Sequence, residues 1–76
     1  MPFEEFKDLL VAMGLPGDDI LPTATREEAG LDSLTVAELT LELRQRYGIT
    51  VAEEEIHAVE TVAGVAELIG TRRAGS

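Results

Sequence analysis

The residues that could do chemistry gather where Asp32, Ser33 and Leu34 join an irregular segment to a helical one. The stretch from Gly30 to Leu34 reads GLDSL, and the serine in it has three possible uses. Its hydroxyl could cap the helix by accepting a hydrogen bond from a free backbone N–H. It could instead act as a nucleophile, or carry a phosphate group, which the N-terminus of a helix favours.

Ser33 lacks the partners that a hydrolase nucleophile needs. Such a serine requires a base, an orienting acid and an oxyanion hole, and the only imidazole in the chain belongs to His57. The G-x-S-x-G turn is absent, because the residues around the serine read LDSLT. The chain has no cysteine, and a single histidine cannot form a metal site by itself. The sequence therefore predicts a protein that is not an enzyme and holds no metal.

A capping role fits Asp32 and Ser33 equally well, since either side chain can accept a bond from an unpaired N–H of the first turn. Capping alone does not explain why an acid and a serine stand together at the end of a long loop. Phosphorylation of Ser33, or a phosphodiester bond to it, is chemically reasonable at this position. The residues themselves leave the cap and the modification site open.

Hydrophobic periodicity predicts an all-α fold, a small four-helix bundle of three main helices and one short helix with a long first loop. The predicted segments are a first helix over 3–13, a loop over 15–32, a second helix over 33–47, a short helix over 53–59, a last helix over 62–70 and a polar tail over 71–76. Thr61 is the expected cap of the last helix, and Thr50 and Glu53 have capping-box spacing. We expect one domain over 1–76 and a freestanding chain.

The first loop is unusually long for so small a domain, and loops of that length are often functional. It holds two prolines and two glycines before the GLDSL stretch ends. We expect Ile20, Leu21 and Leu31 to anchor it on the core.

The second helix carries two apolar stripes rather than one. The first stripe, assigned to the core, consists of Val36, Leu39, Leu43 and Tyr47. The second stripe consists of Leu34, Ala37 and Leu41, with Glu38 beside it. Two interpretations stay open: the helix is central and buried on both sides, or the second stripe is an exposed contact surface for a partner.

Composition excludes several classes of protein. Fifteen acids against six bases give a net charge of −9, which would repel nucleic acid. No apolar run approaches the ~18 residues of a membrane span, so we expect a cytoplasmic, soluble protein. Ten acids and two bases fall in residues 1–43, which suggests a partner with a basic docking surface. The acids could equally serve only to keep the protein in solution.

The chain resembles the acyl carrier protein family. The stretch GLDSL is similar to the family's attachment motif, and ETVAGVAELI, at residues 60–69, is similar to its last helix. The resemblance implies that Ser33 receives phosphopantetheine from coenzyme A and that the arm holds acyl groups as thioesters. Asp32 and Leu34 match the residues on either side of the attachment serine.

The resemblance also implies partners and further sites. The partners are a phosphopantetheinyl transferase and acyl-loading, condensing or acyl-transfer enzymes with basic patches, and we expect a monomer. The implied docking residues are Leu34, Ala37, Glu38 and Leu41, and the implied acyl-cleft residues are Ile56, Val62 and Ala63.

The resemblance implies a carrier in polyketide, lipopeptide or fatty-acid-type biosynthesis. Arg44 and Arg46 stand where carriers of fatty-acid synthesis usually have further acids, which favours the first two of these pathways. The segment 29–32 departs from the Gly-Gly-x-Ser pattern of peptidyl carriers and favours acyl cargo. The alternatives are a non-catalytic helical interaction domain and a peptidyl or aminoacyl carrier of a nonribosomal pathway.

Overall fold

A computed structural model describes residues 1–74 of the chain. Its four helices form where apolar residues recur every three or four positions along the sequence. These helices are α1 (Phe3–Ala12), α2 (Ser33–Glu42), α3 (Glu53–His57) and α4 (Val62–Ala74). A short 3₁₀ turn, η1 (Gly17–Asp19), interrupts the first loop, and a wider π-helical segment, η2 (Leu43–Tyr47), continues α2. The predicted all-α bundle is confirmed, with no strand among the described residues.

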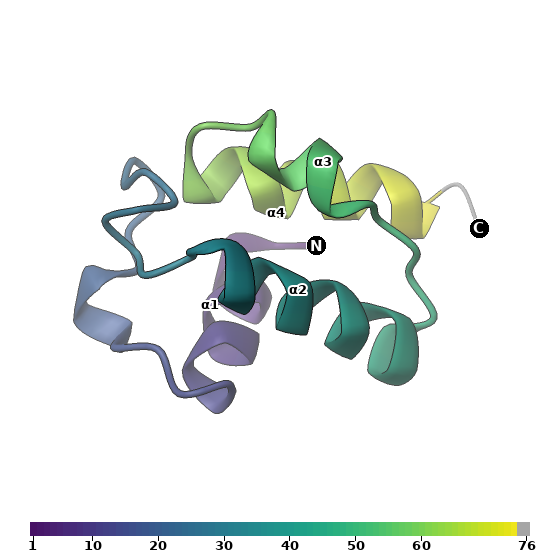
Figure 1. Cartoon of the computed structure of the whole chain (residues 1–76), viewed down its shortest axis with the longest axis horizontal. Coiled ribbons are helices and arrows are strands. Elements are labelled where there is room, and N and C mark those ends of the chain that lie inside the picture. Colours follow the sequence, from purple (N-terminus) through teal and green to yellow (C-terminus); the bar gives the residue numbers. More distant parts are fainter. Residues whose placement is uncertain (75–76) are drawn as a thin grey trace.

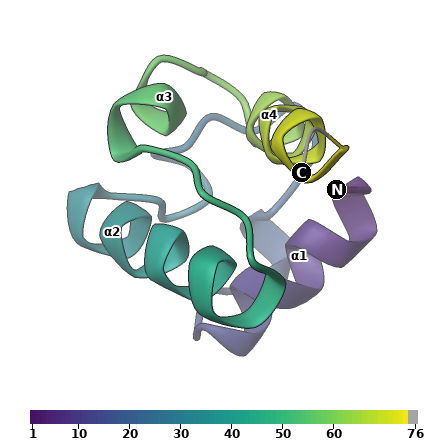
Figure 2. The same ribbon diagram turned by 90° about the vertical axis from the view of Figure 1, so that its right-hand side faces the viewer.

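The helices enclose one apolar core. Helix α2 packs beside α3, and α1 packs beside α4. Figure 1 shows α2 crossing in front of α1, with α3 and α4 above them, and Figure 2 shows the same arrangement from the side. The fully buried side chains include Phe6, Leu10, Ile20, Leu31, Val36, Leu39, Leu43, Ile56, Val62, Val65 and Ile69. No polar or charged residue of the described chain is buried, so burial of apolar surface stabilises the fold.

The second helix ends where the sequence predicted, at Gly48. This glycine has a φ of 67° and a ψ of 24°, a left-handed conformation that glycine adopts without steric cost. Leu43 is fully buried and Tyr47 is half-buried, so the predicted core face continues through η2.

The first loop is anchored as predicted by Ile20 and Leu31, which are fully and almost fully buried. The prediction for Leu21 is wrong, because its side chain is 53% exposed. Two adjacent residues of this irregular segment do not both face the core, and Ile20 takes that position. Sequence reasoning missed Ala24 and Ala29, small residues of the same loop that are buried.

Of the two caps predicted for the third and fourth helices, one is wrong and the other is confirmed. The Thr50–Glu53 capping box is wrong, because Glu53 is the first residue of α3 and Ala52 is its N-cap. Glu55 Oε1 instead accepts from the Ala52 N–H at 3.3 Å. The predicted cap of α4 is confirmed, since Thr61 Oγ1 accepts from the backbone N–H of residue 64 at 3.1 Å.

Helix α4 does not end at residue 70 as predicted but continues to Ala74. Two arginines in the segment predicted to be a polar tail bind the rest of the bundle. The Arg72 guanidinium pairs with the Glu55 carboxylate of α3, and Arg73 Nη1 lies 2.7 Å from Glu5 Oε1 of α1. Arg73 also lies 5.7 Å from the centre of the Tyr47 ring. These contacts hold the last turn of α4 against its neighbours. Residues 75–76 of the predicted tail lie outside the described residues.

Two leucines on different faces of α2, Leu39 and Leu41, allow a direct test of the fold. Leu39 is fully buried and Leu41 is 42% exposed on the same helix. We predict that Leu39→Ala lowers the free energy of unfolding by about 2–5 kcal/mol, because it leaves a cavity in the core. Leu41→Ala should lower it by less than about 1 kcal/mol. Urea unfolding followed by circular dichroism measures both, and equal losses would show that the two faces are assigned incorrectly.

Candidate functional site

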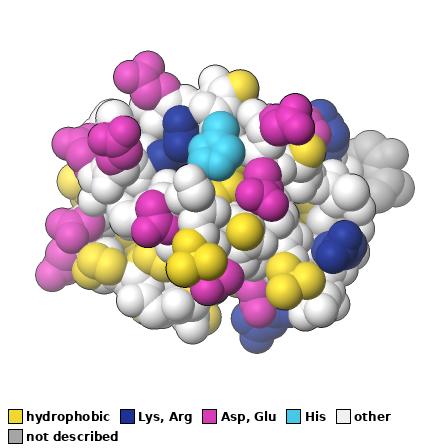
Figure 3. Space-filling view, in the orientation of Figure 1, with side chains coloured by type: hydrophobic (Ala, Val, Ile, Leu, Met, Phe, Trp, Pro, Cys, Tyr) yellow, Lys and Arg dark blue, Asp and Glu magenta, His cyan; other side chains and the backbone are white. Residues whose placement is uncertain are grey.

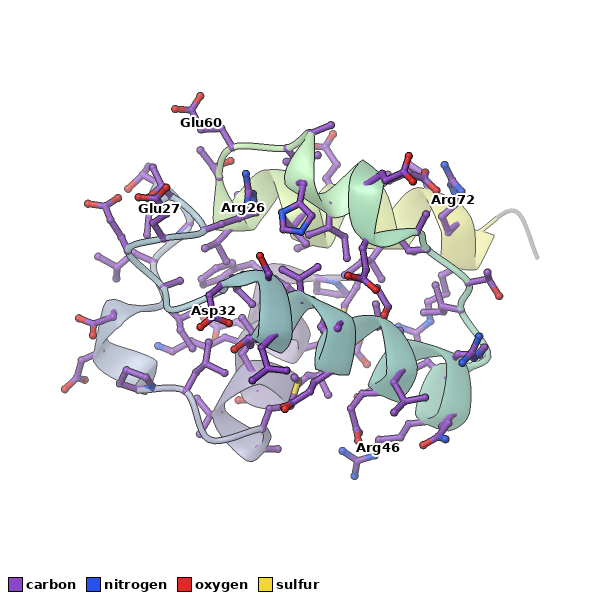
Figure 4. The ribbon with its side chains drawn as sticks, viewed as in Figure 1. Arg26, Glu27, Asp32, Arg46, Glu60 and Arg72 are labelled. Atoms are coloured by element: carbon purple, nitrogen blue, oxygen red, sulfur yellow. The ribbon has the colours of Figure 1, made fainter. Side chains whose placement is uncertain are left out.

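The start of α2 is built by Asp32, not by Ser33. Asp32 Oδ1 accepts from the Thr35 N–H at 2.8 Å, and the Asp32 carbonyl accepts from the Val36 N–H at 2.9 Å. Asp32 is therefore the N-cap residue, and Ser33 is the first residue of the helix. The sequence left open whether Asp32 or Ser33 caps the helix, and in the structure Asp32 is the cap. Figure 4 shows Asp32 at the end of the loop that leads into α2.

The Ser33 side chain makes no contact that would support the start of the helix in the described chain. Its side chain is exposed, and its hydroxyl makes no hydrogen bond with any described residue. It stands at a helix N-terminus, where unpaired N–H groups and the helix dipole favour an anion. The hydroxyl is thus open to solvent at a position that suits a phosphoester.

The Asp32 carboxylate is held in its charged form. The Thr35 backbone N–H, and after it the Thr35 hydroxyl, lower the pKa of the Asp32 carboxyl from its ordinary value, against a smaller opposing effect of desolvation. Asp32 is exposed to solvent and lies next to Ser33 in the chain, and the hydrogen bonds from Thr35 favour its ionised form.

The loop before Ser33 is fastened to the connection between α3 and α4. Arg26 donates from Nε to the Val59 carbonyl at 2.6 Å and from Nη2 to the His57 carbonyl at 2.9 Å. Its third contact joins Nη1 to His57 Nδ1 at 3.2 Å. Figure 4 shows the Arg26 side chain reaching from the loop toward α3. Sequence reasoning missed this role, because a single arginine in a loop carries no signal for a partner 33 residues away.

His57 is engaged by Arg26 and forms no hydrogen bond with Ser33 in the described chain. A serine nucleophile needs a base within hydrogen-bonding reach. The arrangement gives no support to a Ser33–His57 catalytic pair.

The second stripe of α2 is exposed, so the interpretation of a helix buried on both sides is wrong. Leu34 is 70% exposed, Ala37 is half-buried and Glu38 is exposed, with Leu41 farther along the same surface. We call these four residues the α2 strip. Figure 3 shows hydrophobic and acidic side chains next to each other on this face of the molecule.

The predicted acyl-cleft residues do not share one environment. Ile56 and Val62 are fully buried in the core, and Ala63 is half-buried. Their burial places the first two inside the bundle, and their role toward an acyl chain stays a prediction.

Comparison with known families decides the class of protein. A family model described as phosphopantetheine attachment site matches residues 8–69. The chain belongs to this family. Members carry a covalently attached phosphopantetheine and serve as carriers that interact with partner enzymes and with the transferase that modifies them. Carrier domains of this kind are generally non-catalytic. The exposed, unbonded hydroxyl of Ser33 fits such a group, which supplies a thiol when bound.

Residues 1–74 contain neither a membrane-spanning helix nor a metal-binding cluster. None of the helices in this range is long and apolar enough to cross a membrane. No group of histidine and acidic side chains in this part of the chain could hold a metal ion.

The cap contact makes a pH-dependent prediction. Because the folded-state pKa of Asp32 is lowered, its contribution to stability is present above the ordinary aspartate pKa and is lost as pH falls through the folded-state pKa. We predict that wild type exceeds Asp32→Asn in stability at neutral pH and that the difference disappears in acid. Urea unfolding of both proteins at a series of pH values measures this difference, in which the other carboxylates cancel. A difference that does not change with pH would show that the Asp32 charge does not support the cap.

Proposed function

We propose that the protein is an acyl carrier protein whose Ser33 hydroxyl bears the phosphopantetheine arm. The observation that carries this proposal is the division of roles at the start of α2, where Asp32 caps the helix and Ser33 remains exposed and unbonded. The motif GLDSL and membership of the family support the same residue. Asp32 and Leu34 flank the site on either side.

The residues around Ser33 have distinct tasks in this proposal. The Ser33 oxygen forms a bond to the pantetheine phosphate of coenzyme A, and its proton passes to the transferase. The pyrophosphate bond of coenzyme A breaks, and the adenosine bisphosphate portion leaves. Asp32 keeps the first turn of α2 formed while this happens. Arg26 holds the preceding loop through its contacts with Val59 and His57.

The α2 strip is the proposed docking surface for partner enzymes. Leu34 and Leu41 offer apolar contact area, Ala37 lies between them, and Glu38 adds a negative charge. With a net charge of −9, the protein would be steered to basic partners in contacts that are fast and sensitive to salt. Such contacts suit a carrier that must leave each enzyme after delivery.

The proposed cargo is an acyl group rather than an aminoacyl group, in a polyketide or lipopeptide pathway. Two arginines follow the strip, and Arg46 Nη1 lies 3.5 Å from Glu42 Oε2. This pair reduces the negative charge in the last turns of the helix, which distinguishes it from an all-acidic docking helix. Ile56, Val62 and Ala63 are the candidate contacts for an acyl chain inside the bundle. We further propose that the carrier acts as a cytoplasmic monomer.

The site prediction is tested by intact-protein mass. Wild type incubated with coenzyme A, magnesium and a broad-specificity phosphopantetheinyl transferase should gain one phosphopantetheine, and Ser33→Ala should gain none. Circular dichroism of the variant provides the control that it is folded. No gain by folded wild type would support the alternative of a helical interaction domain, and a gain by Ser33→Ala would place the arm on another residue.

Docking is tested by reversing one charge. We predict that Glu38→Lys raises the KM of the transferase for the carrier several-fold and changes the free energy of unfolding by less than about 0.5 kcal/mol, because the side chain is exposed. Glu67→Lys on α4 is the matched control, since this exposed acid makes the same change in net charge away from the strip. Equal effects of the two variants would mean that only net charge matters and that the strip is not the docking surface.

A further inference from the structure

Arg26 joins the first loop to the connection between α3 and α4 through both its backbone and its side chain. Its N–H donates to the Glu60 carbonyl at 3.1 Å, and its carbonyl accepts from the Leu31 N–H at 2.8 Å. Its guanidinium donates to the carbonyls of Val59 and His57 at 2.6 Å and 2.9 Å, and Nη1 lies 3.2 Å from His57 Nδ1. We call the three contacts of the guanidinium the Arg26 side-chain contacts.

These contacts act close to Ser33 in the chain. Leu31 is bonded to the Arg26 carbonyl and is almost fully buried, so its position depends on both. Asp32, the helix cap, follows directly, and Ser33 comes next. A loop that is free to move at Arg26 therefore places the Ser33 hydroxyl less precisely. Covalent bond formation is sensitive to such misplacement, because a displacement of about 1 Å can lower a rate roughly 100-fold.

The contact between Arg26 Nη1 and His57 Nδ1 requires a neutral imidazole. A guanidinium carries only N–H donors, so His57 Nδ1 is the acceptor and the ring proton is on Nε2. When the ring gains a second proton, Nδ1 becomes a donor, and two positive charges face each other. Histidine is the side chain that ordinarily changes charge between about pH 5 and 8. The contact is therefore present while the ring is neutral and is lost as the pH falls and the ring becomes protonated.

His57 is accessible to protons from solvent. Its side chain is exposed, and Figure 3 shows the imidazole at the surface beside a basic side chain. Arg26 is the charged residue in contact with the ring, and the Glu55 carboxylate of α3 is already bound by Arg72 of α4. The other acids on the loop, at the start of α2, on α2, on α3 and on the α3–α4 connection are Glu27, Asp32, Glu38, Glu53, Glu54 and Glu60. In residues 1–74 none of these carboxylates forms an ion pair with the ring, so its protonation acts first on Arg26.

We propose that Arg26 is a positioning residue for the modification of Ser33, and that the neutral His57 ring is the acceptor that keeps Arg26 in place. Protonation of His57 removes the guanidinium from the ring and loosens the loop before Ser33, so the modification slows in acid. The inference rests on the proposed function, because it concerns the rate at which Ser33 is modified. It gives the carrier a pH-dependent competence that acts before any cargo is loaded.

The experiment compares wild type with His57→Asn over a range of pH. The amide oxygen of asparagine can accept from Arg26 in place of Nδ1, and the amide gains no proton in this range. The kcat/KM of a broad-specificity phosphopantetheinyl transferase for each carrier is measured from about pH 5.5 to about pH 8 by intact-protein mass. The ratio of His57→Asn to wild type cancels the pH dependence of the transferase itself. We expect this ratio to rise several-fold as the pH falls, because only wild type loses the acceptor.

Arg26→Gln tests whether the effect passes through the guanidinium. In this background His57→Asn should no longer change the rate in a pH-dependent way, because the Arg26 side-chain contacts are already absent. Arg44→Gln is the matched control, since it removes the same charge from an exposed arginine that has no hydrogen bond or ion pair within residues 1–74. The pH-dependent ratio should persist in the Arg44→Gln background. Circular dichroism confirms that each variant is folded.

Hydrogen exchange of the Leu31 amide tests the same contacts without the transferase or any change at Arg26. The Leu31 N–H is bonded to the Arg26 carbonyl, so its protection reports how firmly the loop is held. Protection factors correct for the intrinsic pH dependence of exchange. We expect the protection of Leu31 in wild type to fall in acid relative to the amides of α1, and to stay constant in His57→Asn.

The outcomes distinguish the two proposals. If folded wild type is not modified at any pH, the proposed function fails at Ser33, and the positioning role fails with it. If wild type is modified but the ratio to His57→Asn does not change with pH, the carrier assignment stands and the positioning role is overturned, even where the protection of Leu31 falls in acid. A ratio that still rises in the Arg26→Gln background would assign His57 to direct contact with the transferase and would also overturn the positioning role.

Discussion

One hydrogen bond fixes the start of α2, the 2.8 Å contact from the Thr35 N–H to Asp32 Oδ1. It satisfies a first-turn donor with the aspartate, so the neighbouring serine is not needed as a cap. The same contact lowers the pKa of the Asp32 carboxyl, because the Thr35 N–H binds the ionised form more strongly than the protonated form.

The rest of the bundle holds that short segment in place. Leu31 is buried immediately before the cap, and Val36 and Leu39 are buried immediately after it. Arg26 ties the preceding loop to the connection between α3 and α4, supported by a hydrogen bond from the Val62 N–H to the Ala24 carbonyl at 2.9 Å. The core therefore fixes the two sides of α2 differently: one face is packed, and the face that follows Ser33 remains open to solvent.

The sequence predicted those features that depend on periodicity. The four helices and the core face of α2 were predicted correctly, because apolar residues at helical spacing face one side of a helix. Periodicity left the second stripe of α2 open, since it does not show whether a neighbouring element covers that face. Leu21 was predicted wrongly, since an irregular loop has no period to show which of two adjacent apolar residues turns inward. The hydrogen bonds of Arg26 to His57 and Val59, and the extension of α4 to Ala74, depend on contacts between residues that are far apart in the sequence. Arg72 and Arg73 look like a polar tail until Glu55 and Glu5 are brought beside them by the fold.

The most direct measurement compares the unfolding free energies of Ser33→Ala and Asp32→Ala with that of wild type, by urea titration at neutral pH. The two substitutions remove adjacent polar side chains from the start of one helix, so the comparison isolates the cap. We predict that Ser33→Ala is as stable as wild type to within about 0.5 kcal/mol and that Asp32→Ala is clearly less stable. A loss of stability in Ser33→Ala as large as that in Asp32→Ala would show that the serine caps the helix. That result would contradict the account in which the Ser33 hydroxyl is unbonded and open to modification.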